Sequence, residues 1–323
     1  MKFKVLNNEA GERVDLFLVK KFSNYSRSIL QQAVESGAVK VNSSVVKSSY
    51  KLKTGNIVSI DKDFFQEVEK PLKIISEKLP LEILYEDENI IAVNKPAGMV
   101  VHPATGNKTG TLVNAILNYD QNIINAIHDE TSKISLSRPG IIHRLDKDTS
   151  GVILIAKNKK TLSSLSKQLQ NKTIKKKYSA LVLGWPQETG SVKSYLTRGK
   201  KNRKIVVEMD SSTGKKAISN YMTEKLLITA DGKNHIALVE IEIPTGRTHQ
   251  IRVQLKGIGH PIIGDQTYNI KESKTVSDIL GAKRQMLHAK TIEFILPGQN
   301  KPIIVTSEIP EDFKKVKSKL KDT

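Results

Sequence analysis

The stretch RPGIIHRLDKDTSGVILIA, residues 138–156, is the most informative part of this chain of 323 residues. An apolar pair, Ile141 and Ile142, leads into a dense polar turn, and the apolar run GVILIA follows it. A polar turn between two buried strands holds its side chains at fixed positions, as a catalytic carboxylate requires. Judged by its residues alone, the turn fits a charged hairpin stabilised by Asp, Thr and Ser turn bonds equally well.

Strand-like segments recur on both sides of this turn, from Leu81 to about Pro310. They are EILYED, NIIAVNKP, GVILIAKN, KKYSALVLG, KAISNYMTEKLLI, HIALVEIEIP and KTIEFILP. Helical patterns fall between them at residues 111–118, 159–170 and 248–256. Neighbouring strand candidates often lack a helix long enough for a parallel crossover. The pattern therefore favours an α+β fold in which helices flank a mixed, largely antiparallel sheet.

The first part of the chain reads as a separate small α/β unit. Two helices are expected at residues 13–21 and 27–36, the second capped by Ser26 and ended by Gly37, and the short strands AVKVN, SSVV and KTGNIVSI follow. We predict a first domain over residues 1–62, a charged linker with two prolines over 63–79, and a larger domain over 80–310. Residues 311–323 are expected to form a short basic helix that frays into a tail.

Composition narrows the class of protein. The chain has 52 Lys and Arg against 33 Asp and Glu, a formal charge of +19, with a pI near 9.7. This surplus suggests a polyanionic partner, although a lysine-rich soluble surface gives the same count. The absence of cysteine excludes disulfides, thiol nucleophiles and cysteine-ligated metals. The first residues lack the apolar stretch of a signal peptide, and the apolar runs are too short to span a bilayer, so we expect a cytoplasmic protein.

Five segments together resemble one known family. HRLDKDTSG, residues 143–151, is similar to the signature of the RluA/RluD-type ribosomal large-subunit pseudouridine synthases. LYEDENIIAVNKPAGMVVHP, KKKYSALVLG, IPTGRTHQIRVQLKGIGHPIIGD and RQMLHAKTIEF resemble the family's other motifs, in the family's order, over about residues 81–297. Residues 13–60 resemble the small RNA-binding module of ribosomal protein S4, with VNS at Val41–Ser43 in place of the usual VNG. That module is common in the D-type enzymes and absent from the shorter A-type ones.

The resemblance implies a pseudouridine synthase fold preceded by an S4-like domain, and it implies a reaction. The enzymes of this family isomerise uridines in large-subunit (23S) ribosomal RNA: the bond from uracil N1 to the ribose breaks, the base turns, and C5 takes its place. No cofactor and no metal are implied. The expected partner is ribosomal RNA of the large subunit or its assembly precursor, with no membrane and no obligate protein partner.

The resemblance assigns three catalytic residues. Asp146 is the essential carboxylate, either as a nucleophile or as the base that removes a ribose proton. Arg252 is the cation expected beside it, in a two-pronged contact that orients the carboxylate. Tyr178 is the tyrosine that stacks on the uracil, and its hydroxyl is a candidate for handling the C5 proton. Asp148, two residues after Asp146, is expected to be a turn residue that points to the other face.

A target uridine in folded RNA must leave its stack, and a side chain is expected to fill the gap. Arg144 is the family's candidate for that insertion. The further predicted RNA contacts are His143, Arg247, Lys95, Asn94, His102, Arg13 and Arg27. For His143 a role in shaping the loop is an equal alternative, and Arg247 is either structural or phosphate-binding. His249, Leu287 and His288 are expected to be scaffold residues, and basic clusters at residues 172–177, 200–204 and 214–216 are candidates for phosphate contact.

Three alternatives remain open at this point. The same reaction could act on transfer RNA or another ribosomal position, because substrate choice depends on shape contacts that the sequence does not show. A non-catalytic RNA-binding factor of ribosome assembly would keep the fold but gain little from a paired buried carboxylate. A glycosidic-bond hydrolase would release the base, but the sequence offers no clear second catalytic carboxylate.

Overall fold

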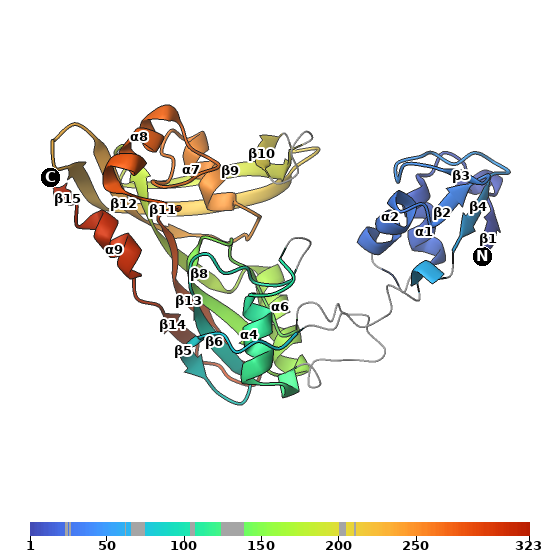
Figure 1. Cartoon of the computed structure of the whole chain (residues 1–323), viewed down its shortest axis with the longest axis horizontal. Coiled ribbons are helices and arrows are strands. Elements are labelled where there is room, and N and C mark those ends of the chain that lie inside the picture. The colour runs from blue at the N-terminus through green and yellow to red at the C-terminus, as the bar shows by residue number, and fades with distance from the viewer. Residues whose placement is uncertain are drawn as a thin grey trace. The chain divides into compact units, whose positions relative to one another are not determined.

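The computed structural model describes residues 1–22, 25, 27–61, 63–65, 75–103, 107–123, 139–199, 205–209 and 211–323. These residues fall into two compact units, one within residues 1–65 and one over residues 75–323 (Figure 1).

The first unit is a small α/β sheet with two helices. Its elements are β1 (Lys2–Lys4), η1 (Asn7–Glu9), α1 (Val14–Lys21), α2 (Arg27–Glu35), β2 (Val39–Val41), β3 (Ser44–Val45) and β4 (Ile57–Ile60). The strands pair antiparallel in the order β1-β4-β2-β3. Phe17 of α1, Leu30 of α2 and Val58 of β4 are fully buried in one apolar core. Both predicted helices are confirmed, whereas the predicted cap Ser26 lies outside the described residues.

A buried carboxylate joins the two helices of this unit. Asp15 of α1 has no exposed side-chain surface, and it accepts hydrogen bonds from Arg13 at 2.9 Å, Arg27 at 2.8 Å and Gln31 at 2.7 Å. Burial alone would raise the pKa of Asp15, but these donors together lower it to about 2. The side chains of Arg13 and Arg27 remain 39% and 49% exposed, so both keep surface open to solvent.

The second unit is built on a single large sheet. Its elements are β5 (Glu82–Glu86), β6 (Ile90–Lys95), α4 (Leu112–Tyr119), β7 (Ser150–Ala156), α6 (Lys159–Asn171), β8 (Lys175–Leu183), β9 (Thr189–Arg198), β10 (Val206–Met209), β11 (Lys215–Thr229), β12 (His235–Glu242), α7 (Gln250–Gly257), α8 (Lys271–Leu280), β13 (Leu287–Phe294), β14 (Ile303–Thr306), α9 (Glu311–Lys317) and β15 (Leu320–Asp322). The order is β10-β9-β11-β12-β8-β13-β7-β6-β5, with β14 beside β13 and β15 beside β11. Among the described strands only β7 and β13 pair in parallel, so the predicted mixed, largely antiparallel sheet is confirmed.

Strand β7 explains the apolar run that follows the polar turn. All seven of its residues are buried, because both faces of the strand are covered. Ile153 and Ile155 belong to the core cluster that includes α4, while Val152 and Leu154 belong to the one that includes Leu165 of α6. A strand buried on both faces is apolar at every position rather than at alternate ones.

The beginning of β7 lies in very close contact with β13. Gly151 has a φ of +114°, and a Cβ added there would lie 2.1 Å from the carbonyl oxygen of Ala289. No side chain fits in that space, so the glycine that ends HRLDKDTSG is required by the packing of the only parallel pair among the described strands.

The predicted basic tail at residues 311–323 is wrong in its second half. Helix α9 is present, and it buries Phe313 and Val316. After it the chain does not fray, because β15 pairs antiparallel with β11, with Leu320 opposite Thr229 (Figure 1). Apolar residues at positions 313, 316 and 320 anchor this segment even though lysines dominate its composition. Helix α8 and the strands β1, β9 and β10 are also present and were not predicted.

Replacing Gly151 with alanine is expected to lower the free energy of unfolding of the second unit by more than about 2 kcal/mol, because strain at positive φ adds to the clash with Ala289. Urea unfolding, followed by the fluorescence of Trp185, the only tryptophan of the chain, measures this loss of unfolding free energy. Gly232→Ala is the matched control: its φ is also positive, nothing lies within 4 Å of an added Cβ, and about 1 kcal/mol is expected. Equal losses in both variants would contradict the close-contact argument.

The first unit is expected to lose stability in acid. Because the folded-state pKa of Asp15 is below its unfolded value near 3.9, the stabilisation is complete above that value and is lost as the pH falls toward 2. The half-exposed arginines limit the loss to on the order of 1–2 kcal/mol. Hydrogen exchange of α1 in the full chain, corrected for intrinsic rates at pH 4 and pH 2.5, measures the change. In Asp15→Asn the amides of α1 should exchange faster at pH 4 than in the parent protein. Their protection should not change between pH 4 and pH 2.5.

Candidate active site

The polar turn before β7 opens onto a pocket of about 550 Å³. Its walls are residues 141–146 of the turn, residues 243–252 between β12 and α7, and the start of β8. Asp146 lies at this pocket with 18% of its side chain exposed. Among the described residues that line the pocket, Asp146 is the only one with a carboxylate.

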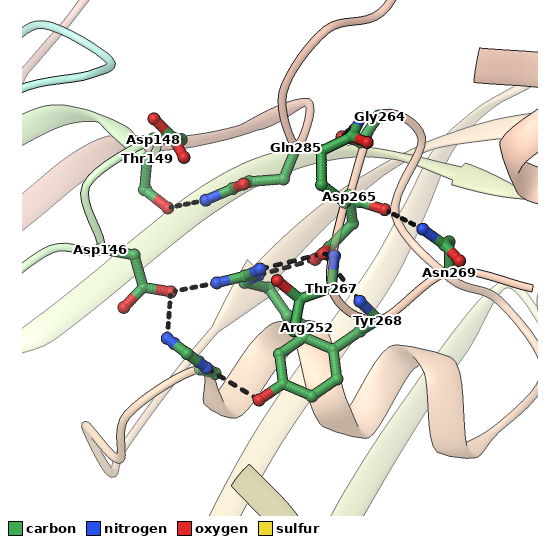
Figure 2. A network of polar contacts seen from close by, with 12 residues as sticks. Asp146, Asp148, Thr149, Arg252, Gly264, Asp265, Thr267, Tyr268, Asn269 and Gln285 are labelled. Carbon is green, nitrogen blue, oxygen red and sulfur yellow. Dashed lines mark hydrogen bonds and ion pairs between the residues drawn. The ribbon is translucent and has the colours of Figure 1, made fainter. Parts of the chain in front are cut away.

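Arg252, in the first turn of α7, lies between two carboxylates (Figure 2). Its Nη1 donates to Asp146 Oδ2 at 3.0 Å, while Nε and Nη2 donate to Asp265 at 2.6 and 2.9 Å. The two-pronged contact predicted for Asp146 therefore goes to Asp265, and Asp146 receives a single bond. Burial would lower the pKa of Arg252, but the two carboxylates raise it above its usual value, so the guanidinium stays charged.

Asp265 is a site residue that the sequence analysis missed. It is 3% exposed, and it also accepts the backbone N–H groups of Thr267 at 2.8 Å and Tyr268 at 2.9 Å (Figure 2). Burial would raise its pKa, but the bonds from Arg252 and these amides lower it. With four donors around it, the carboxylate fixes the plane of the guanidinium. An acidic residue directly after the buried segment PIIG was the available signal.

His249 is the second group that faces Asp146. Its Nε2 lies 3.9 Å from Asp146 Oδ2, and its Nδ1 lies 2.8 Å from the hydroxyl of Tyr268. That hydroxyl also accepts the N–H of Val206 at 2.7 Å, so Tyr268 links His249 to β10. Burial lowers the pKa of His249, which favours the neutral ring. His249 has a φ of +54°, a strained conformation for a non-glycine residue.

Lys95, the last residue of β6, is bonded to the backbone of the turn that carries Asp146. Its side chain has no exposed surface, and its Nζ donates to the carbonyls of Pro96 at 2.7 Å, Met99 at 2.9 Å and Lys147 at 3.0 Å. The prediction that Lys95 contacts RNA is therefore wrong, because all three ammonium protons are used inside the fold. Burial lowers the pKa of Lys95 to about 7, against the opposing charge of Asp148.

The loop before β13, together with the start of β13, also holds this turn. Arg284 Nη1 donates to the carbonyl of Asp148 at 3.0 Å, while its Nε and Nη2 pair with Asp312 at 2.6 and 2.8 Å. Gln285 donates to Thr149 Oγ1 at 3.3 Å. His288 bonds Ser150 at 3.0 Å and the Ser307 carbonyl at 3.2 Å, which agrees with the predicted scaffold role. Arg284 and Gln285 were not predicted.

Tyr178, Arg144 and His143 are among the predicted residues that line the pocket together with Asp146. Tyr178 of β8 is buried, and burial and the charge of Asp146 raise its pKa, so its hydroxyl keeps its proton at neutral pH. Arg144 is exposed at the pocket. His143 accepts the N–H of Leu154 at 3.2 Å, and burial lowers its pKa to about 3; this geometry favours the loop-shaping alternative.

The remaining predicted contacts divide between the pocket and other places. Arg247, exposed, and His102, largely buried, line the pocket. Asn94 does not line it, and its amide donates to Glu82 Oε2 at 2.8 Å on β5, so the predicted RNA contact of Asn94 in this pocket is not supported. The cluster at residues 200–204 lies outside the described residues. The described part of the chain has no group of His, Asp and Glu side chains that could hold a metal ion, and no helix in it is long and apolar enough to cross a membrane.

Comparison with known proteins gives matches along nearly the whole chain. A family model described as RNA pseudouridylate synthase matches residues 89–256, and an S4 domain model matches residues 12–58. An uncharacterized RNA pseudouridine synthase of Chlorobaculum parvum is 38% identical, over 99% of this chain and 98% of its own. Ribosomal large subunit pseudouridine synthase D of Xylella fastidiosa is 36% identical, over 96% and 89%. The fold also matches human RNA pseudouridylate synthase domain containing 1, with a TM-score of 0.57 and 22% identity, over 77% of this chain and 91% of the human one.

Replacing Asp265 with asparagine is expected to cost about 3 kcal/mol of unfolding free energy, because the buried Arg252 loses its main counter-charge. Urea unfolding followed by Trp185 fluorescence measures this loss. The conservative control is Asp278→Asn in α8, an exposed aspartate, for which a change below about 0.5 kcal/mol is expected. If Asp265→Asn were as stable as the parent protein, the two-pronged ion pair with Asp265 would not be what holds Arg252 in place.

Proposed function

This chain belongs to the RNA pseudouridylate synthase family, and from that membership we propose that it isomerises uridines of large-subunit ribosomal RNA to pseudouridine. The chain is an RNA pseudouridine synthase, an isomerase, with an N-terminal S4 domain. The proposal concerns its substrate and the residues that act on it.

The observation that carries the proposed mechanism is the position of Asp146. The pocket presents one carboxylate, held by Arg252 at 3.0 Å, beside the buried ring of Tyr178. In the reaction the N1–C1′ bond breaks, a C5–C1′ bond forms, the C5 proton leaves and N1 gains a proton. Atoms and electrons balance without an oxidant or a cofactor. Asp146 acts on the ribose, as a nucleophile at C1′ or as the base that takes a ribose proton.

Tyr178 and Arg144 have different proposed tasks. The phenol of Tyr178 is protonated in the free protein, which favours stacking beneath the uracil and hydrogen bonding over action as a pre-formed base. Arg144 is exposed next to Asp146, and its planar cationic head suits the gap that a flipped uridine leaves in the RNA stack. Arg252 positions the carboxylate of Asp146 in the same pocket.

The relatives support ribosomal RNA as the substrate. Several that are named ribosomal large subunit pseudouridine synthase D match this chain over more than nine-tenths of its length, and so include the S4 domain. A charge of +19 and the half-exposed Arg13 and Arg27 fit a polyanionic RNA. We propose a cytoplasmic location, because the relatives come from bacteria, whose ribosomes lie in the cytoplasm.

Asp146→Asn is expected to reduce pseudouridine formation at least about a thousandfold while RNA affinity stays within about twofold. Purified protein is incubated with unmodified large-subunit ribosomal RNA and, separately, with transfer RNA. Pseudouridines are then mapped by carbodiimide-dependent reverse-transcription stops. Asp148→Asn is the matched control, since its side chain lies two residues away and does not line the pocket; it should keep its activity.

The outcomes separate the alternatives. Stops in ribosomal RNA that vanish in Asp146→Asn and persist in Asp148→Asn support both mechanism and substrate. Stops in transfer RNA alone overturn the substrate and keep the mechanism. If the parent protein binds RNA but produces no stops on either substrate, the catalytic proposal fails and the assembly-factor alternative replaces it. Release of free uracil would instead identify a hydrolase.

A further inference from the structure

Lys176 is a buried lysine in the active-site pocket that the proposed reaction does not use. It lies on β8 two residues before Tyr178, on the same buried face of the strand, and it lines the same pocket. Only 7% of the residue is exposed. Within the described part of the chain its Nζ donates no hydrogen bond and has no carboxylate within 4 Å. The nitrogen is open to the pocket, and a charge on a largely buried side chain without a counter-charge is costly, so a fold that keeps one there suggests an anionic ligand.

The surroundings of Lys176 suit an anion. Arg247 lines the pocket, and its Nε donates to the Lys216 carbonyl at 3.2 Å, while its terminal nitrogens donate no hydrogen bond within the described residues. A Cβ added to Gly246 would lie 3.4 Å from Lys176 Nζ, so the glycine leaves room beside the ammonium. Residues 248–250, which lead into α7, line the same wall, and the N-terminus of a helix attracts negative charge.

The protein itself does not supply the missing counter-charge. Asp146 is the only carboxylate among the described residues that line the pocket, and it is bonded to Arg252. Lys176 and Tyr178 are separated by the rise of two strand residues, roughly 7 Å. A uracil stacked on Tyr178 therefore leaves space for its ribose, with a phosphate at Lys176.

We propose that Lys176 and Arg247 form a phosphate subsite that binds the phosphodiester adjoining the target uridine inside the active-site pocket. This inference rests on the proposed function and deepens it, because it names the two side chains that bind the phosphate of the target nucleotide. The subsite fixes where the ribose lies relative to Asp146, and it is distinct from the base-stack contact proposed for Arg144 in the same pocket.

The subsite predicts that RNA binding takes up a proton at Lys176, which makes the RNA affinity depend on pH. Burial and the charge of Arg247 lower the pKa of Lys176 to about 8 in the free protein. A bound phosphate favours the ammonium form, so RNA binding takes up a proton, and affinity falls as the pH rises above about 8. Arg247 is the charged group that acts on Lys176 directly. The other titratable or charged groups that line the pocket with it are His102, His143, Arg144, Asp146, Lys172, Tyr178, His249 and Arg252.

The test compares the full-length parent protein with K176M and K176R. The dissociation constant for an unmodified large-subunit ribosomal RNA transcript is measured against salt at pH 7, and against pH between 7 and 9. K176M should reduce the slope of log affinity against log salt by about 0.7 to 0.9, the value of one phosphate contact. Between pH 7 and pH 9 the parent should lose roughly tenfold in affinity relative to K176R, because arginine does not titrate in that range.

K175M is the matched control, since Lys175 is the preceding residue of β8, is exposed, and pairs with Glu293 at 2.8 Å outside the pocket. It should keep the parent's pH dependence and salt slope. K176M removes an unpaired buried charge, so it should be at least as stable as the parent by urea unfolding. A K176M protein that unfolds more readily than the parent would show that Lys176 is structural, and would overturn the subsite.

An unchanged salt slope in K176M, or an equal pH dependence in the parent and K176R, overturns the subsite even if pseudouridine is formed. If no RNA is modified but K176M still loses one phosphate contact, the subsite is supported and the proposed reaction fails. Loss of affinity in K175M equal to that in K176M would assign the effect to general surface charge and overturn the subsite as well.

Discussion

The bidentate ion pair between Arg252 and Asp265 sets the position of the one guanidinium nitrogen that reaches Asp146. Asp265 is itself held by two backbone amides of the turn that follows it, so it has little freedom to rotate. The ring of Tyr268 lies 5.0 Å from the same guanidinium and covers one face of it. A carboxylate that must act at a defined atom of the substrate benefits from a partner whose direction is fixed before the substrate arrives.

The turn that carries Asp146 is fixed in a similar way, through its backbone. Lys95, Arg284, Gln285 and His288 bond consecutive residues of the segment 147–150, and they come from β6, from β13 and from the loop before β13. Because most of these bonds go to carbonyls and hydroxyls beyond Asp146, the carboxylate itself stays available to the pocket. The turn is polar in sequence, but four consecutive residues of it are hydrogen-bonded to the surrounding fold, and β7 follows it directly.

The amino-acid sequence predicts the buried strands of the sheet, but it does not predict which charged side chains pair inside the fold. Continuous apolar runs such as GVILIA predict strands covered on both faces, and β7 has that arrangement. The proximity of Asp146 and Arg252, which are 106 residues apart, came from resemblance to a family, since no local pattern contains it. The ion pair between Arg252 and Asp265 and the burial of Lys95 were missed. Residue type alone does not show which partner a charged side chain contacts inside the fold. The strand β15 was missed because its pairing energy comes from β11 and its own residues are mostly polar.

The bond from Arg284 to the Asp148 carbonyl has a consequence for how the protein is made. Arg284 is clamped on its other side by Asp312 in the first turn of α9, so the catalytic turn is braced by residues that leave the ribosome long after the turn does. Domains tend to fold as units once their sequence has emerged. During translation Lys95 is available to the turn at once, whereas Arg284 lacks its ion pair with Asp312 until α9 is synthesised. An enzyme proposed to modify ribosomal RNA would thus complete the bracing of its catalytic turn only near the end of its own synthesis.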